Sequence, residues 1–376
     1  MASFKQNKRL IFFAMVILFF SLTLVYMRTA PEQNGVHAES DSEIARQETI
    51  TRQTQRAQTI LNEIQSGPTA QRELLSRQLI GQMDPIQALK ENEQVAFARS
   101  HLPPNIKPDK IFKATFHGVT SYGILEKARN PNRCLLIYHQ GHAGSPYSFL
   151  YFEQLKTHIF AQGCDVLALS MIGRGFNQGP VSFPANVNGE LIHLDAKEAS
   201  KHESYASYRD PKHPLLSSLS LFLTGNHAII RHVSQRYTEV KMVGISGGGW
   251  QTTLTSALFT GIDESYSFAG TLPLSFRTEQ KNKGDFEQVG ASLWKQYDYW
   301  HFYWLATYDS NQEQTRTHHQ LFNANDTCCF SNPAAADFAS TVQNLRNTAL
   351  RAQVFQRATH DIDPKIFLEK VYPARR

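Results

Sequence analysis

The sequence predicts an α/β fold with a mostly parallel central sheet and helices on both of its faces. Two observations indicate this class from about residue 110 onward. Short apolar runs, such as 133–138 and 239–244, are typical of buried strands, and stretches of helical length separate them. Strands that alternate with helices form parallel sheets, because each crossover helix packs on a face of the sheet.

The individual elements follow from the apolar periodicity and from Gly- and Pro-rich breaks. In chain order they are a hairpin over 110–126, a strand over 133–138, a helix over 147–162, a strand over 166–169, a helix over 215–236, a strand over 239–244, a helix over 250–259, strands over 266–269, 318–323 and 350–355, and a helix over 364–371. Two stretches without a clear period, about 176–214 and 271–316, are expected to be insertions.

The N-terminus contains a basic segment, residues 1–9, followed by an almost unbroken apolar run, residues 10–27. About 18 apolar residues are just enough for a helix to span a bilayer. Because the basic residues precede the run, we expect an uncleaved transmembrane signal-anchor, a cytoplasmic N-terminus and a periplasmic or otherwise extracytoplasmic location for the rest of the chain. The alternative is a secreted protein released by signal cleavage near Val36-His37-Ala38.

Residues 28–104 are predicted to form a helical stalk or extension. After the Gly67-Pro68 break, helical pieces are expected over 69–81 and 85–100, and a Pro-rich break follows them. We place the domain boundary at that break and assign residues 105–376 to the α/β domain.

The composition narrows the choice of partners. The formal net charge is +5, but the basic residues of the first 28 positions account for four of these charges. The rest of the chain is close to neutral, so nucleic acid is not an expected partner. The cysteines Cys134, Cys164, Cys328 and Cys329 have no C-x-x-C spacing, which argues against zinc or thioredoxin-like chemistry. An extracytoplasmic domain allows disulfides, but the sequence does not give the pairing.

A serine between glycines separates the strand at 239–244 from the helix after it. Residues 244–248 read Gly-Ile-Ser-Gly-Gly and fit the G-x-S-x-G pattern, with Ser246 at its centre. Glycines at these positions let the chain reverse and keep the hydroxyl clear of neighbouring Cβ atoms. The alternative is a Gly-rich turn that only caps a helix, but the flanking strand and helix favour a nucleophile.

From Lys110 to the C-terminus these features resemble an α/β-hydrolase. A hairpin opens the region, a buried strand ends in the loop 139–142 (His-Gln-Gly-His), and the serine turn follows a later strand. That loop is similar to the His-Gly-His-Gly-Gly loops of some secreted esterases and differs from the His-Gly-Gly-Gly form of lipases. The resemblance implies the chain order serine, acid, histidine, with the last two on loops after later strands.

Asp326 and His360 fit the acid and the histidine of this order. Asp326 follows the penultimate predicted strand and His360 follows the last one, so a parallel sheet brings both loops to the carboxyl edge where Ser246 emerges. The alternative role for Asp326 is that of an Asx-turn residue. Glu287 in the second insertion and Asp361 beside the histidine are rival acids.

The predicted chemistry is nucleophilic acyl transfer. Ser246 attacks a carbonyl, His360 takes its proton, and Asp326 holds the imidazole tautomer and stabilises its cation. The backbone N–H groups of Gly247 and of Gly141 or His142 are expected to hold the oxyanion. This chemistry requires neither a metal nor an organic cofactor, so none is expected.

The sequence therefore predicts a serine hydrolase, in the first place a carboxylic-ester hydrolase that acts on a small-molecule or polymeric ester. Acyltransferases and peptidases use the same triad, because the pocket selects the acceptor. A catalytically silent binding protein with this fold is the third interpretation, and the intact set of Ser246, Asp326 and His360 argues against it.

Overall fold

The computed structural model describes residues 33–81, 87–91 and 102–372, apart from residues 187, 312 and 347. The predicted basic segment and membrane anchor, residues 1–27, lie outside the described residues. Within the described ranges, none of the helices combines the length and the apolar character that a membrane span requires.

The chain divides into two compact units, Met1–Thr51 and Arg52–Arg376, and the second contains the sheet. The sequence places the start of the catalytic domain near residue 105, whereas the compact unit starts at Arg52. The reason is apolar packing from the end of α2 (Gln33–Gln65) and from α3 (Pro68–Leu79). The side chains that join the main core are Ala57, Ile60, Leu61, Ile64, Leu75 and Leu79.

The predicted helix over 85–100 is wrong in its described part. Residues Gln87–Glu91 form the strand β1, which pairs antiparallel with β2 (Lys110–Phe116). Tertiary context overrides the weak helical preference of this short stretch, because an open edge of β2 offers it backbone partners.

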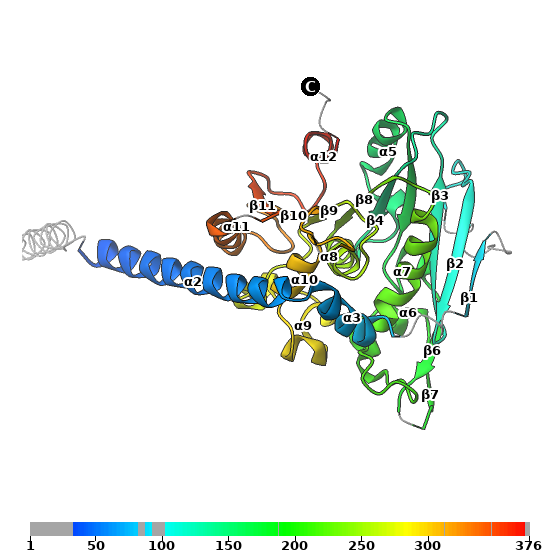
Figure 1. Cartoon of the computed structure of the whole chain (residues 1–376), viewed down its shortest axis with the longest axis horizontal. Helices are drawn as coiled ribbons and strands as arrows, with labels where there is room; N and C mark the ends of the chain where they lie inside the picture. Colours follow the sequence, from blue (N-terminus) through cyan, green and yellow to red (C-terminus); the bar gives the residue numbers. More distant parts are fainter. Residues whose placement is uncertain are drawn as a thin grey trace, which may run out of the picture. The chain divides into compact units, whose positions relative to one another are not determined.

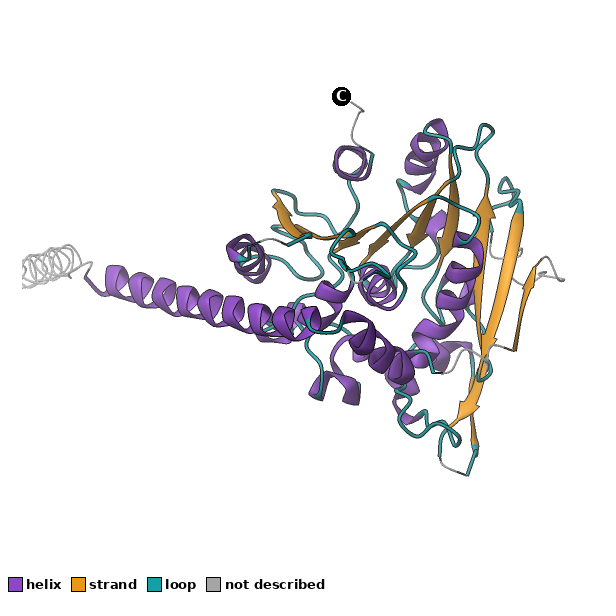
Figure 2. Ribbon diagram, in the orientation of Figure 1, coloured by secondary structure: helices purple, strands orange, loops and turns teal. Residues whose placement is uncertain are grey.

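The central sheet has the strand order β1-β2-β3-β5-β4-β8-β9-β10-β11 (Figures 1 and 2). The remaining strands are β3 (Val119–Glu126), β4 (Cys134–His139), β5 (Cys164–Leu169), β8 (Glu239–Ile245), β9 (Glu264–Phe268), β10 (Thr317–Asn323) and β11 (Leu350–Phe355). Neighbouring strands are parallel from β5 to β11 and antiparallel from β1 to β5. The predicted mostly parallel sheet is confirmed.

Helices cover both faces of this sheet, as Figure 1 shows. They are α5 (Phe152–Ala161) and α12 (Pro364–Val371) on one face, and α7 (Ser220–Ser234), α8 (Gly247–Leu258) and α11 (Ala334–Asn344) on the other. Side chains of β4 alternate between the faces. Leu136 packs in the cluster that contains Phe152 of α5, and Leu135 packs with Ile229 of α7.

The two expected insertions carry short elements. The first contains η2 (Gly175–Asn177), β6 (Val181–Pro184), β7 (Leu191–Leu194), α6 (Ala196–Ala199) and η3 (His202–Ser207), and the second contains η4 (Leu274–Phe276), η5 (Gln280–Asn282), α9 (Phe286–Val289), η6 (Ser292–Lys295) and α10 (Tyr299–Leu305). The aromatic residues Trp300, Tyr303 and Trp304 of α10 are fully buried. They therefore belong to the core.

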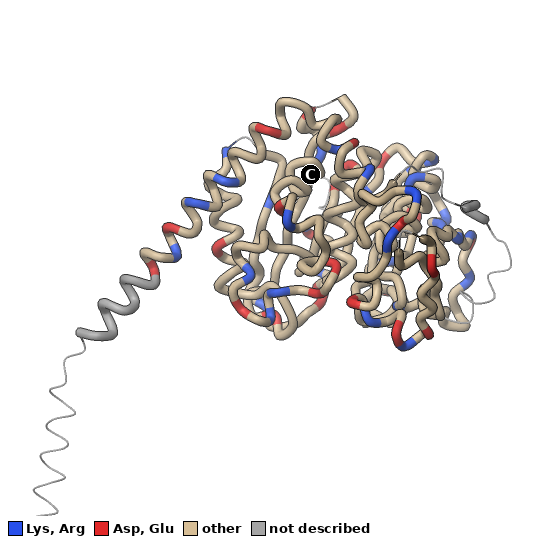
Figure 3. Tube along the Cα trace, turned by 90° about the horizontal axis from the view of Figure 1, so that it is seen from below, with Lys and Arg blue, Asp and Glu red and all other residues tan. Residues whose placement is uncertain are grey.

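Positions of Lys or Arg and positions of Asp or Glu are interspersed along the compact unit (Figure 3). This distribution agrees with the near-neutral charge of the chain after its N-terminal segment. One buried ion pair contributes to the packing, because Nζ of Lys156 on α5 donates to Glu126 on β3 at 3.0 Å. The pair ties a covering helix to the sheet.

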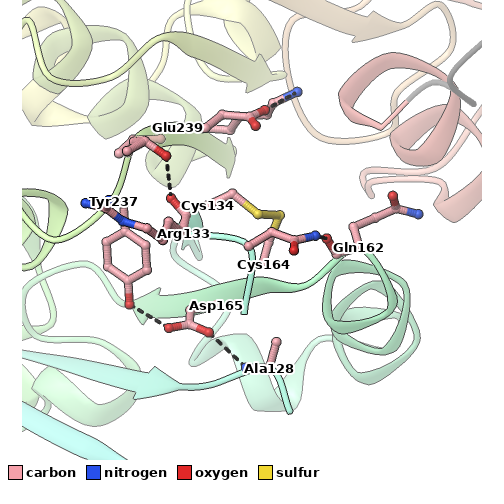
Figure 4. The surroundings of a disulfide bond; sticks show 12 residues. Ala128, Arg133, Cys134, Gln162, Cys164, Asp165, Tyr237 and Glu239 are labelled. Carbon is pink, nitrogen blue, oxygen red and sulfur yellow. Dashed lines mark hydrogen bonds and ion pairs between the residues drawn. A yellow bond between two sulfur atoms is a disulfide. The ribbon is translucent and has the colours of Figure 1, made fainter. Parts of the chain in front are cut away.

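The four cysteines form two disulfides of different kinds. Cys134 and Cys164, which are the first residues of the neighbouring strands β4 and β5, form one disulfide (Figure 4). Beside this bond, Asp165 accepts hydrogen bonds from the Tyr237 hydroxyl and the Ala128 N–H. The second bond joins the adjacent residues Cys328 and Cys329 in the loop after β10.

Candidate active site

Ser246 lies at the turn between β8 and α8 in an unusual backbone conformation. Its φ and ψ angles are 57° and −126°, so a residue with a side chain occupies the region of positive φ. Such a conformation is strained and persists only where the surrounding structure enforces it. In the fully described stretch from Val240 to Leu258, Ser246 is the one residue that is not buried.

Close backbone contacts exclude a side chain at the two glycines of the G-x-S-x-G pattern. A Cβ on Gly244 would lie 2.1 Å from the carbonyl oxygen of Gly248, and a Cβ on Gly248 would lie 2.0 Å from that of His139. Both partners are backbone atoms, so a rotamer change cannot relieve either clash. The sequence pattern is thus the steric condition for packing this turn against the loop after β4.

The loop after β4 lies beside the serine and offers free N–H groups. A Cβ on Gly141 would lie 2.8 Å from Cβ of Ser246 and 3.1 Å from the backbone nitrogen of Gly247. Among the described residues, the N–H groups of Gly247 and His142 have no acceptor. Gly247 also begins α8, where N–H groups lack helical partners and the helix dipole favours negative charge.

Asp326 and His360 form a hydrogen-bonded pair after β10 and β11. Nδ1 of His360 donates to Oδ2 of Asp326 at 2.8 Å, because a carboxylate only accepts. The other oxygen, Oδ1, accepts from the N–H groups of Cys328 at 2.7 Å and Cys329 at 3.1 Å. Asp326 is therefore an Asx-turn residue and a histidine partner at once, whereas the sequence presented these roles as alternatives.

Backbone hydrogen bonds join the loops along the carboxyl edge of the sheet. Each N–H that follows one strand reaches a carbonyl at the end of the next strand. These bonds are Ser246 to Phe268 at 2.8 Å, Ala269 to Leu321 at 2.8 Å and Ala324 to Phe355 at 2.8 Å. The chain of contacts fixes the serine turn relative to the loops that carry Asp326 and His360.

The contact between the serine and the histidine is open. Within the described residues, Oγ of Ser246 and Nε2 of His360 make no hydrogen bond to each other or to any other group. Such catalytic contacts often tighten only in the complex with substrate. The structure thus brings Asp326 and His360 into contact and holds Ser246 on the same edge of the sheet.

The two rival acids have other partners. Asp361 accepts a hydrogen bond from the Thr359 hydroxyl at 2.9 Å and lies 3.7 Å from the Arg357 guanidinium. Glu287 lies on α9, where its carboxylate is fully buried and contacts His142 and His202.

The partners of Glu287 include a residue that sequence reasoning missed. His202 lies at the start of η3, 60 positions from His142 and 85 from Glu287. No motif links residues at such separations. The clustering follows from the way the two insertions fold over the loop after β4.

The pKa of Glu287 is held well below its ordinary value. Burial disfavours the carboxylate, but the close ring nitrogens and the charges of His142 and His202 outweigh it. Burial also disfavours the charged form of His142, but the contacts with Glu287 and Asp285 prevail over burial and over the Arg174 charge, so its pKa is raised. The cluster therefore keeps a buried negative charge at neutral pH.

His139 has a structural role in the same loop. Its Nδ1 lies 2.9 Å from the carbonyl oxygen of Gln140, and its Nε2 accepts from the Asn226 amide at 2.9 Å. Complete burial lowers the pKa of His139 to about 4. The ring is neutral at pH 7, and both of its nitrogens have partners.

No protein-family model and no curated protein matches this chain. Among solved structures it is similar to Est1E from Butyrivibrio proteoclasticus, at 14% identity and a TM-score of 0.43, with 69% of this chain and 95% of that chain covered. It is also similar to methylesterase BT1017, at 14% identity and a TM-score of 0.47, with 85% of this chain and 64% of that chain covered. A third similar structure is acetyl xylan esterase 1 from Thermoanaerobacterium sp. JW/SL YS485, at 14% identity and a TM-score of 0.44, with 75% of this chain and 86% of that chain covered. Likenesses at this distance assign neither a family nor an activity.

Proposed function

We propose that this protein is a serine hydrolase that cleaves carboxylic esters through an acyl-enzyme. The observation that carries the proposal is the partly exposed Ser246 at positive φ, on the same sheet edge as the Asp326–His360 pair. A serine at a strained strand-to-helix turn is the geometry of a nucleophile elbow.

The proposed reaction begins when Oγ of Ser246 attacks the ester carbonyl and Nε2 of His360 takes its proton. Asp326 accepts from Nδ1–H and stabilises the imidazolium. The N–H groups of Gly247 and His142 hold the oxyanion, and loss of one such donor costs about 3 kcal/mol of transition-state stabilisation. The ester C–O bond then breaks, and His360 returns the proton to the leaving alcohol. A water that His360 deprotonates finally releases the acid from Ser246.

Turnover of acyl esters of graded chain length, with matched amides and an added alcohol acceptor, tests the proposal. We expect the full chain to hydrolyse esters and the Ser246→Ala variant to lose about 10⁶-fold in turnover, as in the serine-protease precedent. Ser66→Ala is the matched control, because Ser66 is exposed. Near-normal ester turnover by a folded Ser246→Ala variant would contradict the proposal, and faster cleavage of amides or transfer to the alcohol would redirect it to a peptidase or an acyltransferase.

We also propose that residues 10–27 anchor the chain in a membrane, with the catalytic unit outside the cytoplasm. The basic residues before the apolar run support this orientation, and the Cys134–Cys164 disulfide suits an oxidising compartment. An anchored protein stays in the membrane fraction after a high-salt wash and keeps its original N-terminus. A soluble mature chain that starts near residue 39 would instead indicate a cleaved signal peptide.

A further inference from the structure

Three side chains from separate segments meet beside the proposed oxyanion loop. His142 comes from the loop after β4, His202 from η3 and Glu287 from α9. Nε2 of His142 lies 3.1 Å from Nδ1 of His202 and 3.1 Å from Oε1 of Glu287. Nδ1 of His202 lies 3.0 Å from Oε2 of Glu287. Two ring nitrogens and one carboxylate thus converge on a single point.

More hydrogen-bond acceptors than N–H donors face the point where the three side chains meet. Nε2 of His202 lies 3.2 Å from the carbonyl oxygen of Ile172, which only accepts, so Nε2 carries the proton of the neutral ring. Nδ1 of His202 then presents a lone pair to the Glu287 carboxylate, which also only accepts. Only the Nε2–H of His142 can point into the cluster.

One carboxylate oxygen is left without a hydrogen bond. Oε1 of Glu287 is buried and accepts from no donor among the described residues, since the ring N–H of His142 is directed at His202. A buried carboxylate oxygen without a partner is costly. With both imidazole rings neutral, the site therefore lacks a positively charged group at the point where the three residues meet.

We propose that His142, His202 and Glu287 bind a divalent zinc ion. Imidazole nitrogens and carboxylate oxygens are standard zinc ligands, at about 2.0–2.2 Å from the ion. Ligand atoms at that distance around a tetrahedral ion are roughly 3.3 Å apart, and the separations in the cluster are 3.0–3.1 Å. An ion at the shared point is bound by the lone pairs of the Glu287 carboxylate, of His202 Nδ1 and, once His142 carries its proton on Nδ1, of His142 Nε2.

Asp285 supplies a further carboxylate on the solvent side. Its Oδ2 lies 3.5 Å from Nε2 of His142, and its side chain is 53% exposed, whereas Glu287 is fully buried. The charges of Asp285 and Glu287 balance those of a divalent cation. Two nitrogen ligands favour zinc over Mg²⁺ or Ca²⁺, which prefer oxygen.

Outer contacts hold the ligands in place, as metal sites require. The Ile172 carbonyl fixes the tautomer of His202, and the Trp294 indole N–H donates to the backbone oxygen of Glu287 at 2.9 Å. On its other edge, the His142 ring lies beside Gly247, where an added Cβ would be 2.6 Å from Cε1 of His142. A bound ion would thus fix His142 beside the serine turn. The ion site stands independently of the serine chemistry, and only this last consequence rests on the proposed function.

Titration calorimetry of the full chain, purified without a metal-affinity tag and treated with chelator, tests the site with Zn²⁺ as the probe. We expect one Zn²⁺ per chain, no comparable binding of Mg²⁺, and a rise in melting temperature on zinc addition, because a ligand that binds the folded state stabilises it. His142→Ala, His202→Ala and Glu287→Gln should each weaken binding by more than about 100-fold, the upper end of what loss of an outer contact costs.

The control variant is His193→Ala, because His193 is exposed on β7 and lies outside the cluster. It should bind Zn²⁺ as the original chain does. His142→Ala keeps the test decisive if a buried variant fails to fold, since the His142 side chain is 21% exposed. Absence of zinc binding by the original chain, equal binding of Mg²⁺, or unchanged zinc affinity in a folded His142→Ala variant would overturn the proposal.

Discussion

Two carboxylates contact histidines of the candidate site, and their surroundings differ. Asp326 contacts one histidine, His360, whose side chain is 22% exposed and whose Nε2 has no partner among the described residues. Glu287 contacts two histidines, His142 and His202, and its own side chain has no exposed surface.

This difference in surroundings indicates that the Asp326–His360 pair can transfer protons, whereas the Glu287 cluster can only position groups. A general base exchanges a proton in every turnover, so one ring nitrogen must be free to reach the substrate. His360 meets this condition. In the Glu287 cluster the ring nitrogens that meet the carboxylate already face other groups, which suits a fixed support or a bound ion. A strongly lowered pKa singles out Glu287, yet geometry favours Asp326 as the catalytic acid.

The largest effect expected from the comparison of the two carboxylates tests which of them orients His360. Asp326→Asn removes the anionic acceptor of Nδ1–H and favours the wrong tautomer, so we expect kcat to fall by about 10⁴-fold, as in the serine-protease precedent. Steady-state kinetics with the best ester from the substrate series measures the loss.

Two matched variants sharpen this test. Asp361→Asn removes a neighbouring carboxylate that bonds Thr359 and not His360, so its kcat should change little. Glu287→Gln should cost less than about 10³-fold, because it acts only through His142, one of the proposed oxyanion donors. The assignment fails if Asp326→Asn keeps near-normal turnover while Glu287→Gln falls by several orders of magnitude.

The next effect tests the oxyanion side of the turn. A Cβ on Gly141 would meet the carbonyl oxygen of Ile245 at 2.6 Å and Cβ of Ser246 at 2.8 Å, so Gly141→Ala must displace the loop. We expect kcat to fall by about 10²- to 10³-fold, the cost of one lost oxyanion donor. Gly67→Ala is the control, because its Cβ would only touch Ala70 at 3.8 Å. Equal kcat in the two variants would argue against the loop's role.

Sequence reasoning reached Asp326 and His360 because each follows a strand of a parallel sheet. Apolar runs reveal such strands, and strand order along the chain then places the loops on one edge. The sequence did not indicate the Glu287 cluster, since His202 and Glu287 come from insertions whose apolar residues have no clear period. The same limit explains β1, where the pairing with β2 decides the structure of a short stretch whose own preference is weak.

The Cys134–Cys164 disulfide should contribute to the stability of the fold and not to turnover. The Cys134–Cys164 bond joins strand starts, so it lies at the amino edge of the parallel strands, opposite the loops of the candidate site. Replacing both cysteines by serine should lower the free energy of unfolding by about 2–4 kcal/mol. Urea denaturation measures the loss, and kcat at saturating substrate should stay within about twofold. A large loss of kcat with unchanged stability would contradict this separation.

The smallest effect concerns a histidine that has no carboxylate partner among the described residues. His318 lies in β10 between the hydroxyl of Ser265 and the amide of Gln320, and burial lowers its pKa to about 3. Below its ordinary pKa of about 6.5 the unfolded chain binds a proton that the folded chain rejects. The stabilising contribution is complete above pH 6.5 and is lost as the pH falls toward 3.

The expected slope from His318 is about 1.4 kcal/mol of unfolding free energy per pH unit over that range. Denaturation at several pH values, compared with His318→Gln, measures this slope, and the other buried histidines contribute equally to both proteins. Identical slopes would show that His318 does not titrate as its burial implies.

The most direct measurement of the central claim is covalent labelling of the full chain by a fluorophosphonate, followed by peptide mass spectrometry. Such a probe reacts with a serine only where a base activates its hydroxyl. We predict one adduct per chain, on the peptide that carries Ser246. Labelling should be strongly slowed by Asp326→Asn and unchanged by Asp361→Asn. An adduct on another residue, or no adduct on a chain that hydrolyses esters, would contradict the assignment of Ser246 as the nucleophile.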